Sequence, residues 1–332
     1  MGTETQLEQP LLKITDLHLS FFTDRGELRV VEDVSFNILA GETVALVGES
    51  GCGKTVTALA IMGLMDEPGR IVRGSIRLKG EELVGLSEKD LQQWRGRRIG
   101  MIFQEPMTSL NPVFTVGNQI GEVLIRHFAM GKDEVRTEVL RLLQKVGIPS
   151  PERRIDQYPH ELSGGMKQRV MTAIALACKP DLLIADEPTT ALDVTIQAQI
   201  LHLLKELQKE MGMSILLITH NLGIVAHFAQ RVVVMYAGKV AEQAGVRDLF
   251  KNPLHPYTQA LLAALPSPIH TMLRLQSIKG TVPTPLEYPV GCRFSTRCPA
   301  AMPHCSQNDP ILKEQEPQHD VACWLYERPS HS

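Results

Sequence analysis

Hydrophobic and polar positions along the chain follow two different periods. Apolar residues alternate with polar ones between Leu12 and Phe21 and again from Val34 to Ile38, which predicts two strands near the N-terminal end. Continuous apolar runs predict buried strands at residues 43–47, 99–103, 182–185 and 214–219. Between these runs the apolar spacing is mostly helical. A further strand is predicted at residues 74–80.

One long stretch of the chain has helical spacing without an intervening strand. Val135, Val139 and Val146 fall on one face of a predicted helix that ends at Gly147. We interpret the stretch as a helical insert, at about residues 112–170, between the parts of a central sheet.

The composition is that of an ordinary globular protein. The 332 residues are 43% hydrophobic and 21% charged, and this length suggests about two domains. A formal net charge of −3 gives no reason to expect a nucleic-acid partner. No apolar run is long enough to span a bilayer, and the polar residues 1–10 are unlike a signal peptide. We therefore expect a cytosolic protein, or one that binds a membrane through its partners.

Residues 48–55 read GESGCGKT and fit the pattern G-x-x-x-x-G-K-[ST]. They lie between the predicted strand 43–47 and a helix predicted over residues 55–64, as a phosphate-binding loop requires. Its glycines let successive N–H groups face inward, and the helix start adds a partial positive charge. Lys54 is expected to reach the β- and γ-phosphates, and the Thr55 hydroxyl to ligate Mg²⁺. The nucleotide-binding residues expected here are Gly48, Glu49, Ser50, Gly51, Cys52, Gly53, Lys54 and Thr55.

An aromatic side chain, Phe21 or Phe22, comes at the end of the first predicted strand. One interpretation is ordinary core packing. The other is a platform on which the adenine ring stacks, because an aromatic face can hold a planar base. Phe21 is the candidate for that second role.

Three polar residues follow buried strands at positions where the sites of parallel sheets lie. Gln104 follows the run 99–103, and Asp186 and Glu187 end the run that starts at residue 182. In isolation, such residues are often only solvated strand ends. Beside a phosphate loop, the Asp holds Mg²⁺ and the Glu polarises a water aimed at the γ-phosphate. The loop also gives Gln104 a ligand to contact, so we favour the functional interpretation.

A second helix start with exposed N–H groups is predicted in LSGGMKQR, residues 162–169. Ser163 is a natural N-cap, and Gly164 and Gly165 expose backbone N–H groups. A capped helix alone would explain this pattern, but a second anion-binding helix end in one chain favours a phosphate contact. His220 leaves the strand 214–219 at its carboxyl end, where a contact with the γ-phosphate is favoured over a structural role.

Together these motifs resemble those of the ATP-binding subunit of an ABC transporter. GESGCGKT resembles Walker A, Gln104 the Q-loop, LSGGMKQR the ABC signature, LLIADE Walker B, residues 190–193 the D-loop and His220 the switch histidine. The resemblance covers about residues 11–243. It implies an α/β fold of the ABC-type P-loop ATPases, with a RecA-like core sheet, an antiparallel β subdomain and the helical insert.

The resemblance also implies a head-to-tail dimer with two ATP molecules between the subunits. Each ATP then meets Walker A of one subunit and the signature of the other. In this arrangement Ser163, Gly164 and Gly165 bind the γ-phosphate of the ATP that the partner subunit holds, and Asp193 belongs to the D-loop beside it.

Catalytic roles follow from the same resemblance. Glu187 is implied as the general base, with His220 steadying the transition state and Lys54 on the phosphates. Gln104 is implied to link the metal and water to movement of the helical insert. The implied Mg²⁺ ligands are Thr55, Gln104 and Asp186.

Cys52 departs from the commonest form of this loop, because members of the family often carry Ser at that position. Its thiol is at a helix start beside a lysine, an environment that lowers the pKa of a cysteine. From the sequence we therefore expect a thiol that is open to oxidation, and inhibition of the ATPase when it reacts.

Beyond residue 245 the chain resembles the C-terminal extension of the dipeptide, oligopeptide and nickel importer ATPases. The resemblance rests on residues 252–262, NPLHPYTQALL, and on the cysteine motif at residues 291–299. Residues 108–112 and 188–199 are also typical of that subfamily. The resemblance implies peptide uptake and divides the chain into an ATPase domain, residues 11–250, and an extension, residues 251–332.

The extension is rich in cysteine, with the spacing C-x5-C-x6-C-x17-C at Cys292, Cys298, Cys305 and Cys323. Disulfides are not expected in a reducing compartment, and zinc sites usually present close C-x2-C pairs, which this segment lacks. Dispersed thiolates suit an iron–sulfur cluster, and the subfamily resemblance implies [4Fe–4S]. Zinc, with His304 or His319 in place of a thiol, and free buried thiols are the alternatives.

The implied partners are a homologous ATPase subunit in a heterodimer, two transmembrane permease subunits and an extracytoplasmic peptide-binding protein. The chain would then lie at the cytoplasmic face of the inner membrane. Nickel or another small solute is a competing cargo. A soluble ABC ATPase usually carries two cassettes or a long coiled coil, and neither is present here. An iron–sulfur regulatory protein is disfavoured because the catalytic set is complete.

Overall fold

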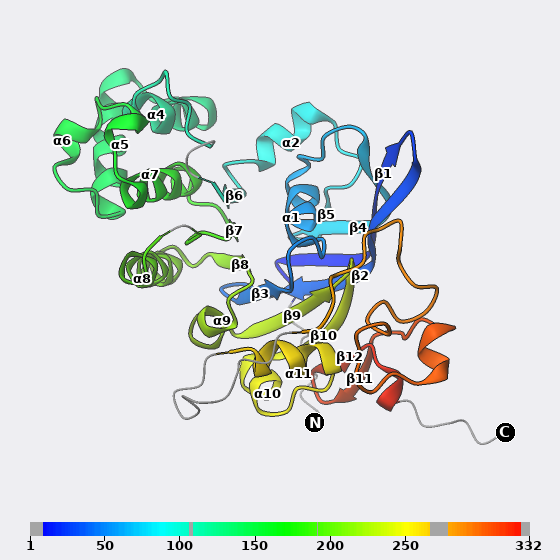
Figure 1. The fold of residues 1–332 in the computed structure, drawn as a ribbon. Coiled ribbons are helices and arrows are strands. Elements are labelled where there is room, and N and C mark those ends of the chain that lie inside the picture. Colours follow the sequence, from blue (N-terminus) through cyan, green and yellow to red (C-terminus); the bar gives the residue numbers. More distant parts are fainter. Residues whose placement is uncertain (1–8, 106–108, 191, 266–277, 327–332) are drawn as a thin grey trace, which may run out of the picture. The chain divides into compact units, whose positions relative to one another are not determined.

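A computed structural model describes residues 9–105, 109–190, 192–265 and 278–326 (Figure 1). The chain forms two compact units, each assembled from separate segments. The first unit consists of residues 1–38, 43–84 and 218–332, and the second of residues 39–42 and 85–217. Within the described ranges, no helix is long and apolar enough to cross a membrane.

The first unit contains an antiparallel sheet with the strand order β2-β1-β4-β5. Its strands are β1 (Leu12–Thr23), β2 (Gly26–Ile38), β4 (Gly69–Leu78) and β5 (Glu81–Glu82). Buried and exposed residues alternate along β1, because one face of this sheet is covered and the other meets solvent. The two strands predicted before the phosphate loop are thus confirmed as an antiparallel pair.

A second sheet in the same unit has the order β11-β12-β10-β9-β3. Strand β3 (Thr43–Val47) is parallel to β9 (Arg231–Tyr236), and β10 (Lys239–Gly245) is antiparallel to β9. Strands β11 (Lys313–Glu316) and β12 (His319–Val321) extend the sheet beyond β10 (Figure 1). The C-terminal segment, residues 251–332, therefore adds two strands to this sheet.

Short helices complete the first unit. They are α1 (Lys54–Met62), α9 (Leu222–Phe228), α10 (Val246–Lys251) and α11 (Pro256–Ala263), with 3₁₀ turns at η2 (Pro303–Ser306) and η3 (Trp324–Tyr326). One hydrophobic cluster joins Val47 and Val234 of the sheet to Leu249, Tyr257 and Phe294. Residues of the C-terminal segment are thus part of the core of this unit.

The second unit holds two parallel strands, β6 (Ile99–Ile102) and β7 (Leu182–Asp186), both fully buried. Strand β8 (Ser214–Thr219) leads from this unit into the first. The helices are α2 (Glu88–Trp94), α4 (Val116–His127), α5 (Lys132–Lys145), α6 (Pro151–Arg154), α7 (Gly164–Leu176) and α8 (Val194–Met211), with a 3₁₀ turn at η1 (Pro159–Glu161).

Helices α4 to α6 and the start of α7 lie in the stretch predicted as a helical insert. Ile120, Val139, Leu143 and Val170 belong to one buried cluster that these helices share. Helix α5 ends before Gly147, whose φ of +74° lies in the left-handed region that glycine adopts without strain. The apolar face read from the sequence is therefore the face that packs.

Candidate nucleotide-binding site

The phosphate loop runs from the end of β3 into α1, in the first unit. Gly48 has a φ of +153°, and a Cβ there would lie 2.2 Å from the carbonyl oxygen of Met235. Gly53, the N-cap of α1, has a φ of +100°. These two positions require glycine, because the chain turns back tightly against β9 before the helix begins. The predicted strand, loop and helix order is confirmed.

Lys54 lies over this loop with its side chain buried. Its ammonium group donates hydrogen bonds of 2.8 Å to the carbonyl of Gly48 and 2.9 Å to that of Glu49. Thr55 follows at the first turn of α1, where it is exposed. A helix start with a lysine and an accessible hydroxyl matches what a phosphate chain with Mg²⁺ needs.

The expectation for Cys52 is wrong. Its side chain is fully buried, and burial raises the pKa of its thiol although Lys54, 3.6 Å away, lowers it in part. The desolvation of the thiolate outweighs the attraction of the nearby ammonium group. Cys52 is therefore a packed, protonated thiol in this structure and not an activated one.

The two candidate aromatic residues lie at the end of β1. Gly69 of β4 leaves room for the ring of Phe21, because a Cβ on Gly69 would come within 2.7 Å of that ring. Phe22 is partly exposed, and the guanidinium of Arg70 lies 3.9 Å from its ring centroid. The ring face of Phe22 is thus covered by the Arg70 guanidinium, which leaves Phe21 as the candidate for stacking on the adenine ring.

The acidic strand end and the Q-loop come together in the second unit. Asp186, the last residue of β7, is buried. The carboxylate of Glu187 accepts hydrogen bonds from the Gln104 amide at 3.2 Å and the Thr190 hydroxyl at 2.7 Å. Glu187 has a φ of +45°, a strained conformation for a residue with a side chain. Such strain is concentrated at functional sites.

The signature motif also belongs to the second unit. Ser163 is the N-cap of α7, and its hydroxyl accepts a 3.3 Å hydrogen bond from the N–H of Met166. Ser163 and Gly164 are exposed, so the N–H groups of this helix start face solvent. A Cβ on Gly165 would approach Ile196 of α8 to 3.2 Å, so the helix start lies close to α8.

Asp193 of the D-loop caps α8. Its carboxylate accepts hydrogen bonds of 3.0 Å from the N–H groups of Thr195 and Ile196. His220 is an exposed residue directly after β8, in the first unit. Residues 106–108 and 191, which include parts of the predicted motifs at 108–112 and 190–193, lie outside the described residues.

A second candidate site is formed by the four cysteines of the C-terminal segment. Cys292, Cys298, Cys305 and Cys323 line one small cavity, together with apolar residues that include Phe294 and Leu325. Burial raises the pKa of Cys292 and of Cys323 to about 11 each, and it also raises the pKa of Cys298. The dispersed spacing in sequence therefore converges in space, as the cluster prediction requires.

The two histidines considered as zinc ligands do not line this cavity. His319 instead places Nε2 2.7 Å from the buried carboxylate of Glu242, and Nδ1 of His304 lies 3.1 Å from the side chain of Asn308. Among the described residues, no three cysteine sulfurs lie within 4.8 Å of one another. A tetrahedral zinc site with Zn–S bonds of about 2.3 Å needs sulfurs about 3.8 Å apart. No three of these sulfurs are therefore placed for one zinc ion. His255 also lines the cavity, and its Nδ1 accepts the N–H of Tyr257 at 3.0 Å.

Three residues with functional contacts were missed by the sequence analysis. Buried Glu242 accepts the N–H groups of Leu254 and His255, and so holds the start of α11 on β10. Tyr257 and Arg297 both contact Glu49 of the phosphate loop. Both stand in motifs that the sequence analysis assigned to the extension, and nothing in their local pattern indicates a contact with the loop.

A glycine loop that presents N–H groups and a lysine at a helix start defines the chain as a P-loop nucleotide-binding protein. Residues 31–190 match the family model described as ABC transporter, and residues 241–305 match that described as Oligopeptide/dipeptide transporter, C-terminal region.

Two curated relatives from Bacillus subtilis resemble the chain over nearly its whole length. The Oligopeptide transport ATP-binding protein AppD is 54% identical over 96% of this chain and 97% of its own. The Dipeptide transport ATP-binding protein DppD is 50% identical over 96% of each chain. A solved structure of the ATP-binding cassette MJ0796, dimeric and bound to ADP and Pi, has a TM-score of 0.65 and 28% identity, covering 71% of this chain and 99% of that one.

The chain therefore belongs to the family of ABC transporter ATP-binding subunits, in its oligopeptide/dipeptide transporter branch. It is an ATPase with the ABC cassette fold.

Proposed function

We propose that this ATPase powers the uptake of dipeptides or oligopeptides through an ABC importer. The observation that carries the proposal is the match of residues 241–305 to the Oligopeptide/dipeptide transporter C-terminal region. The names of the full-length relatives AppD and DppD support it.

Uptake by cells of the organism that carries the chain tests this proposal. The chromosomal copy is replaced by the Glu187→Gln form, and the uptake of a labelled dipeptide, a labelled pentapeptide and nickel is measured. Peptide uptake should fall to background while uptake of a free amino acid is unchanged. Loss of nickel uptake with intact peptide uptake would overturn the peptide assignment and favour the competing cargo.

In the proposed mechanism, each ATP lies between Walker A of one subunit and the signature of a second, homologous subunit. The loop N–H groups and Lys54 bind the phosphates, and Phe21 stacks on the adenine. Ser163, Gly164 and Gly165 offer their exposed helix start to the ATP held by the partner. Hydrolysis then requires closure of the dimer, because neither subunit surrounds the γ-phosphate alone.

Within one subunit, Glu187 acts as the general base toward the attacking water. Its contacts with Gln104 and Thr190 fix the carboxylate in one orientation. His220 is proposed to stabilise the charge that develops on the γ-phosphate in the transition state. Asp193 holds the start of α8, which follows the D-loop.

Mg²⁺ fits the oxygen donors that the motifs supply. Thr55 offers a hydroxyl, Gln104 an amide oxygen and Asp186 a carboxylate, and Mg²⁺ prefers oxygen ligands together with substrate phosphates. When bound, the ion would neutralise charge on the β- and γ-phosphates. Buried Asp186 suits this role because a buried carboxylate is stable when it meets a cation.

We also propose that the four cysteines hold a [4Fe–4S] cluster. Four thiols around one small cavity, with no three of the sulfurs within 4.8 Å of one another, support it. A bound cluster would displace the protons of these thiols and tie the C-terminal segment together. On this proposal the ATPase domain spans residues 11–250 and the extension residues 251–332.

The proposed partners are a homologous ATPase subunit, two membrane permeases and an extracytoplasmic peptide-binding protein. The family supports the first two, since ABC ATPase cassettes act as dimers beside permeases. We accordingly expect this chain at the cytoplasmic face of the membrane, held there by its permease partners.

A further inference from the structure

The C-terminal segment contacts Glu49 of the phosphate loop through both the main chain and the side chain of that residue. The backbone N–H of Glu49 donates a 2.9 Å hydrogen bond to the hydroxyl of Tyr257 in α11. The Glu49 carboxylate pairs with the guanidinium of Arg297 through two bonds, of 2.7 Å and 3.1 Å. Main chain and side chain of the same loop residue are therefore both held by residues far away in the sequence.

Arg297 is held firmly in place to make this contact. Only 4% of its side chain is exposed. Its Nε donates to the carbonyl of Lys279 at 2.9 Å, and its guanidinium also reaches the hydroxyl of Tyr236 at 3.3 Å. The hydrogen bond to Glu49 raises the pKa of Arg297, so the guanidinium carries its charge at neutral pH. A buried, bidentate and charge-assisted pair has the geometry of a fixed anchor.

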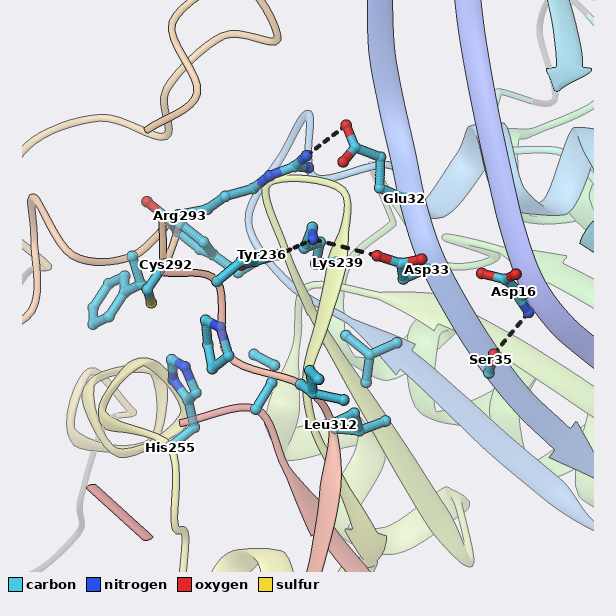
Figure 2. Close-up of a pocket in the computed structure, with 17 residues that line it drawn as sticks. Asp16, Glu32, Asp33, Ser35, Tyr236, Lys239, His255, Cys292, Arg293 and Leu312 are labelled. Atoms are coloured by element: carbon cyan, nitrogen blue, oxygen red, sulfur yellow. Dashed lines mark hydrogen bonds and ion pairs between the residues drawn. The ribbon is translucent and has the colours of Figure 1, made fainter. Parts of the chain in front are cut away.

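A second arginine of the segment reaches the loop indirectly. The guanidinium of Arg293 donates to the carbonyl of Ala237, and it pairs with Glu32 at 2.8 Å (Figure 2). The next residue, Gly238, donates its N–H to the carbonyl of Cys52 in the phosphate loop at 3.0 Å. Arg293 thereby holds the turn between β9 and β10 against the loop.

Both arginines are covalent neighbours of cysteines that line the small cavity. Arg293 follows Cys292, and Arg297 precedes Cys298. The aromatic ring of Phe294 lines the same cavity and packs 5.4 Å from the ring of Tyr257, centroid to centroid. The segment that carries the cysteines is thus continuous with the contacts on Glu49.

We propose that the C-terminal segment positions the phosphate loop, with Tyr257 and Arg297 as positioning residues for ATP binding. The inference rests on the proposed function, since it assumes that residues 48–55 bind ATP. It assigns the extension a part in nucleotide affinity in addition to any role in the importer. A disturbance of the cysteine segment would reach the ATP site through Arg297 and lower its affinity.

Anchoring the phosphate loop affects how tightly the loop binds nucleotide. Its N–H groups bind phosphate only when they converge, and freeing Glu49 lets the loop adopt other conformations that must be reordered at binding. The cost appears in the dissociation constant for nucleotide rather than in the chemical step. At saturating ATP the phosphate loop is fully occupied in the variants as well, so kcat should change little.

The test uses the purified full-length chain and a double-mutant cycle. Arg297→Met and Glu49→Gln remove the two sides of the ion pair singly and together. The dissociation constant for the non-hydrolysable analogue AMP-PNP with Mg²⁺ is measured by calorimetry, with KM and kcat for ATP. Asp320→Ala is the matched control, because it removes a contact of 2.6 Å between the C-terminal segment and Gln243 on β10 without touching the loop.

Each single variant should weaken AMP-PNP binding about tenfold, and the double variant no more than either single, because one interaction is removed in all three. KM for ATP should rise together with the AMP-PNP dissociation constant, while kcat stays within about twofold. The Asp320→Ala variant should bind AMP-PNP normally. Unchanged affinity, additive losses, or an equal loss in Asp320→Ala would overturn the inference.

If Arg297→Met does not fold, Arg297→Lys and Tyr257→Phe replace it. Lysine keeps the charge but not the bidentate fork, and phenylalanine removes only the hydroxyl that accepts from Glu49. Wild-type affinity in both folded variants would likewise overturn the inference. Failure of the wild-type chain to bind AMP-PNP at all would instead overturn the proposed ATP site.

Discussion

The side-chain amide of Gln104 donates a 3.2 Å hydrogen bond to the carboxylate of Glu187. These residues follow the adjacent parallel strands β6 and β7. The pairing joins the Q-loop, which leads to the helical insert, with the acid proposed as general base. Because Glu187 has a φ of +45°, its carboxylate orientation depends on such contacts more than on backbone preference.

The first prediction concerns that acid. Glu187→Gln keeps the size and the contacts of the side chain but removes its basicity. We expect kcat for ATP to fall by at least about 100-fold, because general bases typically contribute 10²–10⁴-fold, with AMP-PNP affinity unchanged. Steady-state ATPase assays and calorimetry check this. Glu152→Gln, on the exposed surface of α6, is the control. A Glu187→Gln chain that still hydrolyses ATP at a tenth of the normal rate would contradict the assignment.

The second prediction concerns the cysteine cavity. Protein purified without oxygen should contain about four iron and four sulfide per chain, and absorb in the visible range. Cys305→Ser should lose both, because one of four ligands is gone. Cys178→Ser, which changes a buried cysteine outside this set, should retain them. One zinc per chain would point to the alternative site, and no metal would leave the thiols as buried core residues.

The third prediction is a dependence of stability on pH that comes from His255. Burial lowers the pKa of this imidazole from 6.5 to about 4. Below pH 6.5 the unfolded chain binds a proton there and the folded chain does not. Stability is therefore fully present above pH 6.5 and is lost as pH falls toward 4. From pH 7 to pH 5 the loss should be about 2 kcal/mol.

Urea unfolding of the chain without a bound cluster, at the two pH values, measures this loss, with His255→Asn as the comparison; His255 lines the cysteine cavity, so the same form is used for both proteins. Nδ1 of His255 accepts the N–H of Tyr257 at 3.0 Å as the cap of α11, and asparagine keeps a capping oxygen without titrating in this range. Nearby Glu242 and His319 are the same in both proteins, so a difference between the two proteins reports on residue 255. An equal pH dependence in both proteins would exclude His255 as its source.

The local elements of the fold could be predicted because their signals lie within a few residues. The apolar runs of β3, β7 and β8 are buried along their whole length, as expected. The glycine pattern of the phosphate loop and the cap at Ser163 are likewise local. The pKa of Cys52 was predicted wrongly, because the sequence shows its lysine neighbour and not the burial that outweighs it.

The sequence by itself determined which residues are proposed to carry phosphate chemistry, since strand, loop, cap and acid are each specified by neighbours along the chain. Only the tertiary structure decided which distant residues contact these groups and hold them in place. Glu49 and Arg297 are 248 positions apart, and four dispersed cysteines converge on one cavity. Such pairings arise when distant segments pack into one core. The periodicity of apolar residues along the chain does not indicate which segments will meet.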